Sequence, residues 1–291
     1  MNYHRPQPGR RASTILGILT AALLVAALPA SAHRIEKKFT VEERPVVTIR
    51  NHHGRIAVKS WKRPEVQVIG EHADQRIEVD TDKSGNRIDV VTHVLAQNMS
   101  PAEMRADYEI LVPEETELQV RTDSGSVVIE RVFGELMIET VAADVEMREV
   151  AGYLVVRTTG GSLVCFRCAG RIEFNSISGG ARLLEPVSSN VRAQTFSGDL
   201  LYDGDFRPGG IYFLKTTDGK IDVRYSENDS FTLSANSIRG KVESDASLKP
   251  PSHSTRPPSG LARGLFGTHN EGLARVELSS FSGIIRIFKR K

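Results

Sequence analysis

The sequence predicts an all-β fold, a β-solenoid (β-helix) whose stacked rungs each consist of a strand, a Gly turn and a second strand. Three observations predict it. Val, Ile and Leu recur in short alternating runs, Ser-Gly pairs separate these runs, and the turns return every 18–21 residues. A β-sandwich of serial antiparallel hairpins is the alternative, because a Ser-Gly turn also suits a hairpin.

The N-terminus has the pattern of a secretory signal peptide. Three arginines precede an apolar run over residues 12–27, and Ala30-Ser-Ala32 provides the small residues of a cleavage site. Cleavage after Ala32 would remove 32 of the 291 residues and three of the 38 basic side chains. The remaining 259 residues, predicted as one β-repeat domain over 33–291, would carry a formal charge of about −1.

This composition limits the compartments and the classes of partner that we expect for the protein. A nearly neutral chain gives no reason to expect nucleic acid or an anionic membrane as a partner. After the signal, the sequence has no second apolar segment long enough to span a bilayer. We therefore expect an exported protein, in the periplasm, outside the cell or on its surface.

The repeat is clearest between residues 117 and 223. Each copy has apolar residues two and four positions before a Thr or Ser, a turn, and two more alternating apolar residues after it. A second corner follows at Gly134, Gly152 and Gly170. The turn positions are Gly125, Ala143, Gly161, Gly179, Gly198 and Gly219, and a further copy ends at Gly283.

A rung of this length cannot bury its own apolar side chains, so the rungs are expected to stack and share a core. Stacked strands lie roughly 4.8 Å apart, which aligns like residues in ladders. The Thr and Ser residues should then form a hydroxyl ladder at the turn. Arg121, Glu139 and Arg157 should pair between neighbouring rungs.

Two segments interrupt the pattern. Ser100-Pro-Ala-Glu103 has an N-cap, an N1 proline and an N3 glutamate, which predicts a short surface helix of one or two turns towards Asp107. A Pro- and Ser-rich stretch predicts an extended loop inserted at about residues 245–272. An inert insertion is the default interpretation of this loop, and a partner-binding segment is the alternative.

Several segments resemble the bacterial putative adhesin family. They are Thr48–Val58 with its turn at Gly54, Trp61, Glu65–Val68, Tyr108–Pro113, Leu118–Gly125 and Thr195–Asp199. The resemblance covers nearly the whole mature chain and implies an exported envelope protein that folds as a β-solenoid. It implies no established catalytic residues. The sequence departs from the family pattern at Ala143, where a turn glycine is expected, and between Asp245 and Gly272.

The two cysteines form a C-x-x-C motif inside the repeat. Cys165 and Cys168 occupy columns that hold core hydrophobes in the other rungs, so they are expected to be buried rather than redox-active. A local disulfide between them stays open, because such close spacing requires a bend in the chain. A structural zinc site would need four ligands, which this motif does not supply.

The sequence predicts no metal and no cofactor. His33 would become the mature N-terminus, where its amine and imidazole could chelate copper, but a single residue is not a motif. Asp144 and Asp199 follow turn positions three rungs apart, about 14 Å by the rung spacing. That distance is too long for a catalytic carboxylate pair, so turn capping is the expected role of both.

We therefore predict an exported, non-enzymatic binding or structural module of the cell envelope. A carbohydrate-active β-helix enzyme, a lyase or hydrolase, is the main alternative, and a partner-sensing module of an envelope stress circuit is a third class. The expected partner is an envelope protein or a surface polysaccharide. The candidate partner surface is an outward apolar patch at Met137, Val155, Val164 and Phe166, unless the chain itself covers it.

Overall fold

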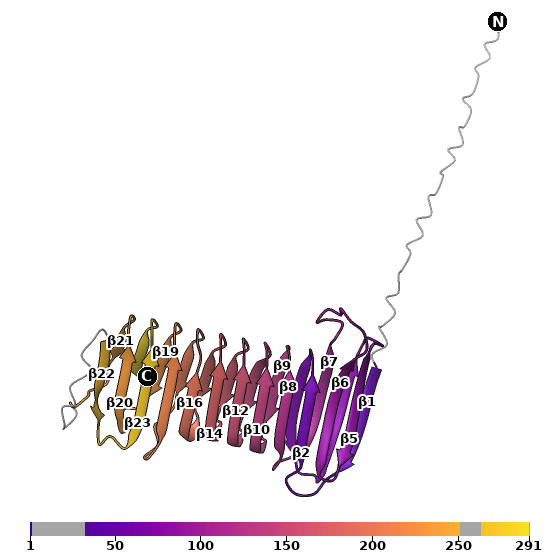
Figure 1. Ribbon diagram of the computed structural model, residues 1–291, viewed down its shortest axis with the longest axis horizontal. Coiled ribbons are helices and arrows are strands. Elements are labelled where there is room, and N and C mark those ends of the chain that lie inside the picture. The colour runs from indigo at the N-terminus through magenta and orange to yellow at the C-terminus, as the bar shows by residue number, and fades with distance from the viewer. Residues whose placement is uncertain (2–32, 251–262, 291) are drawn as a thin grey trace. The chain divides into compact units, whose positions relative to one another are not determined.

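Two twelve-stranded sheets face each other in the computed structural model (Figure 1), which describes residues 33–250 and 263–290 besides Met1. Along most of the stack, strands of successive rungs pair in parallel within each sheet. The predicted β-solenoid is therefore confirmed, and the alternative sandwich of serial hairpins is wrong. The signal sequence and the predicted cleavage after Ala32 lie outside the described residues.

The strands of each sheet follow one another in space as follows. The first sheet contains β1 (His33–Thr40), β4 (Glu65–His72), β7 (Ala106–Pro113), β3 (Arg55–Trp61), β9 (Ser126–Glu130), β11 (Asp144–Arg148), β13 (Leu163–Phe166), β15 (Ala181–Leu184), β17 (Leu200–Asp203), β19 (Ile221–Tyr225), β24 (Ile285–Lys289) and β21 (Val242–Ser244). The second contains β22 (Arg263–His269), β20 (Phe231–Ser237), β23 (Ala274–Ser280), β18 (Ile211–Thr216), β16 (Val187–Gln194), β14 (Ala169–Ser176), β12 (Ala151–Thr158), β10 (Phe133–Thr140), β8 (Glu117–Thr122), β2 (Val46–Asn51), β6 (Arg87–Val94) and β5 (Ile77–Ser84).

Each rung of the central stack places one strand in the second sheet and the next strand in the first sheet, with a turn between them. The apolar columns expected from the repeat are in register: Leu136 of β10 pairs with Leu118 and Leu154, and Cys165 of β13 pairs with Met147 and Leu183. These side chains are buried between the sheets. The core is therefore a set of like residues stacked along the solenoid.

The predicted hydroxyl ladder caps the turns of the central stack from Thr140 onwards, whereas the Thr122 hydroxyl donates to the Ser124 carbonyl at 3.2 Å. The hydroxyl of Thr158 accepts a hydrogen bond of 2.9 Å from the backbone N–H of Gly161. In the rungs further along, hydroxyls also donate to a turn carbonyl of the neighbouring rung, as Thr195 does to Gly179 at 2.9 Å and Thr216 to Gly198 at 3.1 Å. The ladder thus satisfies buried backbone groups within and between rungs.

Glycine is required at these turns because the backbones of adjacent rungs almost touch. A Cβ atom added to Gly161 would lie 1.9 Å from the carbonyl oxygen of Ala143, and one added to Gly179 would lie 1.8 Å from that of Gly161. Ala143, the departure from the glycine pattern, stacks on Gly125, whose φ is 109°. It keeps the same capping bond, from its N–H to the hydroxyl of Thr140 at 2.7 Å.

The opposite corner uses a second kind of ladder. Arg131, Glu149, Arg167 and Glu185 occupy equivalent positions in four rungs, and all have φ values between 49° and 55°. This left-handed conformation turns the chain sharply from one sheet into the other. On the face of the second sheet, Glu139 accepts from Arg121 at 2.8 Å and from Arg157 at 3.4 Å. The charge pairing expected between these rungs is confirmed.

The rungs at the two ends do not follow sequence order. At the C-terminal end, β23 and β24 lie between the β18–β19 rung and the β20–β21 rung, although β20 and β21 precede them in the chain. At both ends antiparallel strands (β1, β5 and β22) form an edge of a sheet, and β21 is only three residues long. Edges of this kind leave few unpaired backbone groups to which a strand of another chain could add in the parallel register of the stack.

Two expectations need correction. The capping box at Ser100 and Glu103 forms, with the Ser100 N–H donating to the Glu103 carboxylate at 2.8 Å, but only one turn follows because β7 begins at Ala106. The predicted helix is therefore wrong. The insertion at 245–272 is also narrower than predicted. Its flanks join the fold through β22 and through Lys249, which pairs with Thr268, while residues 251–262 lie outside the described part.

Candidate functional site

A row of five exposed apolar side chains and two threonines runs along the turns that follow the hydroxyl ladder. It occupies the position directly after each ladder residue from Thr140 onwards, and we call it the turn ridge. In spatial order its members are Val141, Thr159, Ile177, Phe196, Thr217, Phe281 and Ile238. The side chains of Ile177 and Phe196 have exposed fractions of 59% and 56%. Seven rungs with spacings of roughly 4.8 Å give the ridge a length of about 29 Å.

Backbone hydrogen bonds between the rungs hold the ridge in place. The N–H of Phe196 donates to the carbonyl of Ile177 at 3.1 Å, and the N–H of Thr217 donates to the carbonyl of Phe196 at 2.9 Å. Phe281 donates in turn to Thr217 at 3.1 Å. The apolar side chains are therefore presented from an ordered edge, which lowers the entropy cost of binding.

The ridge carries little charge. Beside it, the carboxylate of Asp218 accepts a hydrogen bond of 2.6 Å from the Ser282 hydroxyl. The guanidinium of Arg239 lies 4.9 Å from the centroid of the Phe281 ring at the C-terminal end. At the other end, Asp123 occupies the equivalent position of the rung before Val141 and lies 2.9 Å from His52 Nδ1. Between these ends, the ridge positions themselves hold aliphatic, aromatic or threonine side chains. Such a strip favours a partner surface that is itself apolar and uncharged.

The structure does not bring the four predicted partner-surface residues together. Met137 and Val155 lie on β10 and β12 of the second sheet, whereas Val164 and Phe166 lie on β13 of the first sheet. Because the core separates the outer faces of the two sheets, the four residues cannot form one patch.

Val155 is also only 1% exposed. Its cross-strand neighbours Met137 and Glu173 flank it within the sheet, and the guanidinium of Arg171 lies over the ring of Tyr153 on the same face. Met137, Val164 and Phe166 are half-buried. Side chains of the same sheet therefore surround Val155, so the chain itself covers this residue.

Cys165 and Cys168 are joined by a disulfide in the structure, with their Cα atoms 5.8 Å apart. The bend that such a bridge requires comes from Arg167, whose φ is 52°. Both cysteines are fully buried. In the neighbouring rung, Met147 and Val150 occupy the two positions, so the bridge takes the place of an apolar contact at this corner.

The two turn aspartates cap backbone groups of the next rung. Asp144 Oδ1 accepts from the Ser162 N–H at 2.9 Å and from its hydroxyl at 2.6 Å. Asp199 Oδ1 accepts from the Lys220 N–H at 2.8 Å. Each carboxylate is thus engaged in holding adjacent rungs in register.

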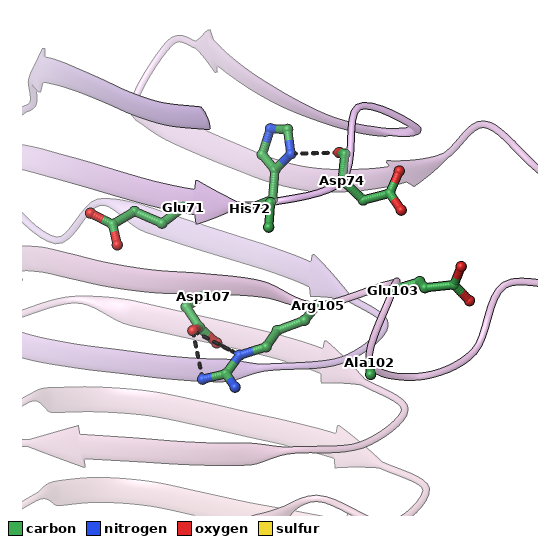
Figure 2. Close-up of a pocket in the computed structure, with 8 residues that line it drawn as sticks. Glu71, His72, Asp74, Ala102, Glu103, Arg105 and Asp107 are labelled. Carbon is green, nitrogen blue, oxygen red and sulfur yellow. Dashed lines mark hydrogen bonds and ion pairs between the residues drawn. The ribbon is translucent and has the colours of Figure 1, made fainter. Parts of the chain in front are cut away.

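A polar pocket of about 410 Å³ lies near the N-terminal end, where β4 ends and β7 begins (Figure 2). Its lining includes His72, Asp74, Glu103, Arg105 and Asp107. Figure 2 shows the His72 ring directed away from the Arg105–Asp107 pair and bonded through Nδ1 to the carbonyl of Asp74, at 3.0 Å. Arg105 Nε donates to both carboxylate oxygens of Asp107, at 3.1 and 2.9 Å.

Arg76 links the two acidic groups at the rim of this pocket. Its Nη2 donates to Asp74 at 2.6 Å and to Glu103 at 2.8 Å. The side-chain hydrogen bonds from Arg76 lower the pKa of Asp74 from 3.8 to about 2. The pKa of Glu103 falls from 4.5 to about 2, first because the Ser100 backbone and hydroxyl donate to it and then because Arg76 does. Both groups are therefore carboxylates engaged with their own neighbours at neutral pH.

Most histidines of the described residues contact nearby polar groups. His52 Nδ1 lies 2.9 Å from Asp123, His53 Nδ1 lies 2.8 Å from the Ser124 hydroxyl, and His93 Nε2 lies 3.1 Å from Asp80. Within the part of the chain that the structure describes, no three side chains of His, Cys, Asp or Glu converge as a metal site. In that same part, no helix has the length and apolar character needed to cross a membrane.

The position directly after the Thr or Ser of each turn carries a sequence signal for the turn ridge. At that position the chain has Val141, Ile177, Phe196 and Phe281, residue types that an ordinary exposed turn does not favour. Reading the turn column for apolar content would have identified the ridge.

Comparisons with solved structures found several folds similar to this chain. A putative adhesin from Bacteroides fragilis is 12% identical, with 89% of this chain and 97% of that chain covered and a TM-score of 0.43. A putative adhesin from Parabacteroides distasonis is 10% identical, with 90% and 98% covered and a TM-score of 0.36. A putative cell adhesion protein from Clostridium sporogenes is 10% identical, with 89% and 100% covered and a TM-score of 0.32.

A search of curated proteins found no match. The family model described as Toastrack DUF4097 matches residues 46–287, from the start of β2 into β24. The resemblance to bacterial putative adhesins that the turn motifs carry is thereby confirmed, and the chain belongs to the Toastrack DUF4097 family.

Proposed function

We propose that this protein is an exported, non-enzymatic binding module of the cell envelope, and that the turn ridge docks in an apolar groove of an envelope protein. The observation that carries the proposal is the row of five exposed apolar side chains, interrupted by two threonines, on a hydrogen-bonded edge. Contiguous exposed apolar surface of this kind is typical of interaction sites. Export follows from the Arg-rich start and the Ala30-Ser-Ala32 cleavage pattern.

The chemistry of the ridge favours a protein over a polysaccharide. Sugars are recognised through planar aromatic faces together with polar and charged groups that bind their hydroxyls. Phe196 and Phe281 offer aromatic faces, but Val141, Ile177 and Ile238 offer neither an aromatic face nor a polar group. Aliphatic and phenyl side chains fill apolar protein grooves. The partner is therefore expected to present an uncharged apolar groove that accepts a protruding edge.

Paired substitutions test this role. A double variant, Ile177→Asp with Phe196→Asp, places two charges at the centre of the ridge, and Arg182→Asp on the outer face of the first sheet serves as the control. We expect the double variant to lose co-purification of the partner from the envelope fraction, with its melting temperature within about 2 °C of the wild type, because the altered side chains are exposed. Retained co-purification would contradict the proposal.

A second copy of this chain is the other occupant that the same experiment addresses. Light scattering of the purified protein distinguishes a self-associating ridge from one that binds a different protein. A dimer that the double variant dissolves would replace the heterologous partner with self-association. If the wild type and the double variant are both monomers, the result agrees with the proposal.

The carbohydrate-active enzyme remains the alternative function. It would require two carboxylates close together in one groove. Asp144 and Asp199, the aspartates that the sequence placed on one face, instead cap backbone groups of their neighbouring rungs. This arrangement supports the binding module as the better proposal.

A further inference from the structure

Two histidines lie opposite each other at the N-terminal end of the solenoid. His33, the first residue of β1, pairs with His72, the last residue of β4, in the antiparallel register of the two strands. Their imidazole rings stack with centroids 5.2 Å apart and planes inclined by 15°. Directly opposed residues of an antiparallel pair have Cβ atoms roughly 4.5–5.5 Å apart, a separation that two imidazoles binding one metal ion can span.

His72 is oriented as a metal ligand needs to be. A carbonyl oxygen only accepts, so the 3.0 Å contact from Nδ1 to the Asp74 carbonyl requires the proton to be on Nδ1. The lone pair is then on Nε2, which has no hydrogen-bond partner among the described residues. In most metal-binding histidines, the ring nitrogen that does not bind the metal donates a hydrogen bond of this kind, which fixes the tautomer and the orientation of the ring.

His33 supplies two further nitrogens if the signal is cleaved where the sequence predicts. Cleavage after Ala32 makes the backbone nitrogen of His33 a free α-amine, and this amine and the imidazole of the same residue can chelate one ion. The rest of β1 anchors this end of the chain, because Ile35 and Phe39 pack against the core on the same face. His33 itself is exposed and can rotate its ring.

We propose that the mature protein binds one Cu²⁺ ion through the α-amine and imidazole of His33 and Nε2 of His72. Three nitrogen donors in one place favour Cu²⁺, because the other divalent ions of the first transition row bind such ligands more weakly. The site goes beyond the binding role proposed for the turn ridge, and it rests only on the predicted cleavage and on the β1–β4 register.

The test compares two forms of the protein that differ at the N-terminus. One begins at His33, prepared by removing a fusion that leaves no extra residue, and the other retains Pro29–Ala32 in front of it. Competition titration with CuSO4 gives the affinity, and electron paramagnetic resonance reports the number of coordinated nitrogens. We expect one Cu²⁺ per chain with three nitrogens for the form that begins at His33, and a loss of at least about tenfold in affinity for the extended form.

Point variants of the form that begins at His33 separate the site from other histidines. His72→Ala should remove one nitrogen from the spectrum and weaken binding about 10- to 100-fold or more, since loss even of a partner of a ligand has that effect. His93→Ala, a strand histidine that lies beside Asp80, should change neither. Equal affinity for the His72→Ala variant and the wild type would overturn the proposal.

The natural N-terminus provides a separate check. The intact mass of the protein exported by its own signal should correspond to a chain that begins at His33. A different first residue would overturn the site in the natural protein, whatever the engineered form binds, and it would leave the function of the turn ridge untouched.

Discussion

Replacing Gly161 with alanine should separate two rungs of the solenoid. A Cβ atom at this position would lie 1.9 Å from the Ala143 carbonyl oxygen, whereas an unstrained contact needs about 3.5 Å. The rungs must therefore move apart by roughly 1.5 Å at this turn. That shift breaks the bonds from Thr159 to Thr140, at 3.3 Å, and from Gly160 to Val141, at 2.7 Å.

The cost follows from these two bonds. Each inter-rung bond that is lost and leaves a poorly solvated backbone group costs about 1–3 kcal/mol, so the loss of two should lower the free energy of unfolding of Gly161→Ala by roughly 2–6 kcal/mol. For a chain of this size the melting temperature should fall by about 4–24 °C. Urea unfolding followed by far-UV circular dichroism measures the first quantity, and calorimetry measures the second.

Gly160, in the same turn, is the matched control. A Cβ atom added there would lie 3.4 Å from the Ser178 hydroxyl and 3.8 Å from the Val141 carbonyl, both close to ordinary contact distance. Gly160→Ala should therefore change stability by less than about 1 kcal/mol, and in the stabilising direction if the unfolded chain dominates the effect. Equal losses for the two variants would refute the close approach of the rungs as the reason for the glycine column.

Three further predictions concern the core, the N-terminal turn and the inserted loop. In urea unfolding, Leu154→Ala should lower the free energy of unfolding by about 2–5 kcal/mol and Arg157→Ala by under about 1 kcal/mol. Equal losses would contradict the assignment of Leu154 to the core and of Arg157 to the outer face. Glu103 should titrate near pH 2 by NMR, so its contribution to stability is complete above pH 4.5 and is lost as the pH falls towards 2; a midpoint near 4.5 would contradict its bonds to Ser100 and Arg76. A six-residue Gly-Ser linker in place of 251–262 should leave the melting temperature within about 2 °C, whereas deleting 249–264 should lower it clearly, because the longer deletion removes paired flanks of the cap.

The central stack could be predicted from the sequence because its information is local and repeated. A column such as Leu118, Leu136 and Leu154 recurs at a constant interval, and the parallel register follows directly from that interval. The capping hydroxyls could be predicted for the same reason, since each lies three residues before its turn glycine.

The ends of the stack could not be predicted in the same way. A repeat specifies which residues face the core, but it does not specify which rung lies beside which. The copy ending at Gly283 could be identified from its sequence, whereas its position before the rung that turns at Gly240 could not. That neighbouring copy, Ser237-Ile-Arg-Gly240, is not among the turns expected from the repeat, although the Ser237 hydroxyl accepts from the Gly240 N–H at 3.1 Å as in the other turns.

The candidate partner surface was wrong for a geometric reason. Outward positions of consecutive strands belong to opposite faces when a turn carries the chain from one sheet to the other. Met137 and Val164 are therefore on separate faces although both point away from the core. The turn positions themselves, which join the two faces, are where the exposed apolar residues gather.

Photo-crosslinking in intact cells tests the central claim most directly. A photoreactive amino acid is placed at Ile177 on the turn ridge, at Phe281 two rungs beyond Phe196, and at Arg182 on the face of the first sheet as the control. We predict that the two ridge positions crosslink to the same envelope protein, identified by mass spectrometry, and that the control position does not. Crosslinks of the same partner to Arg182, or no crosslink from either ridge position, would contradict the account.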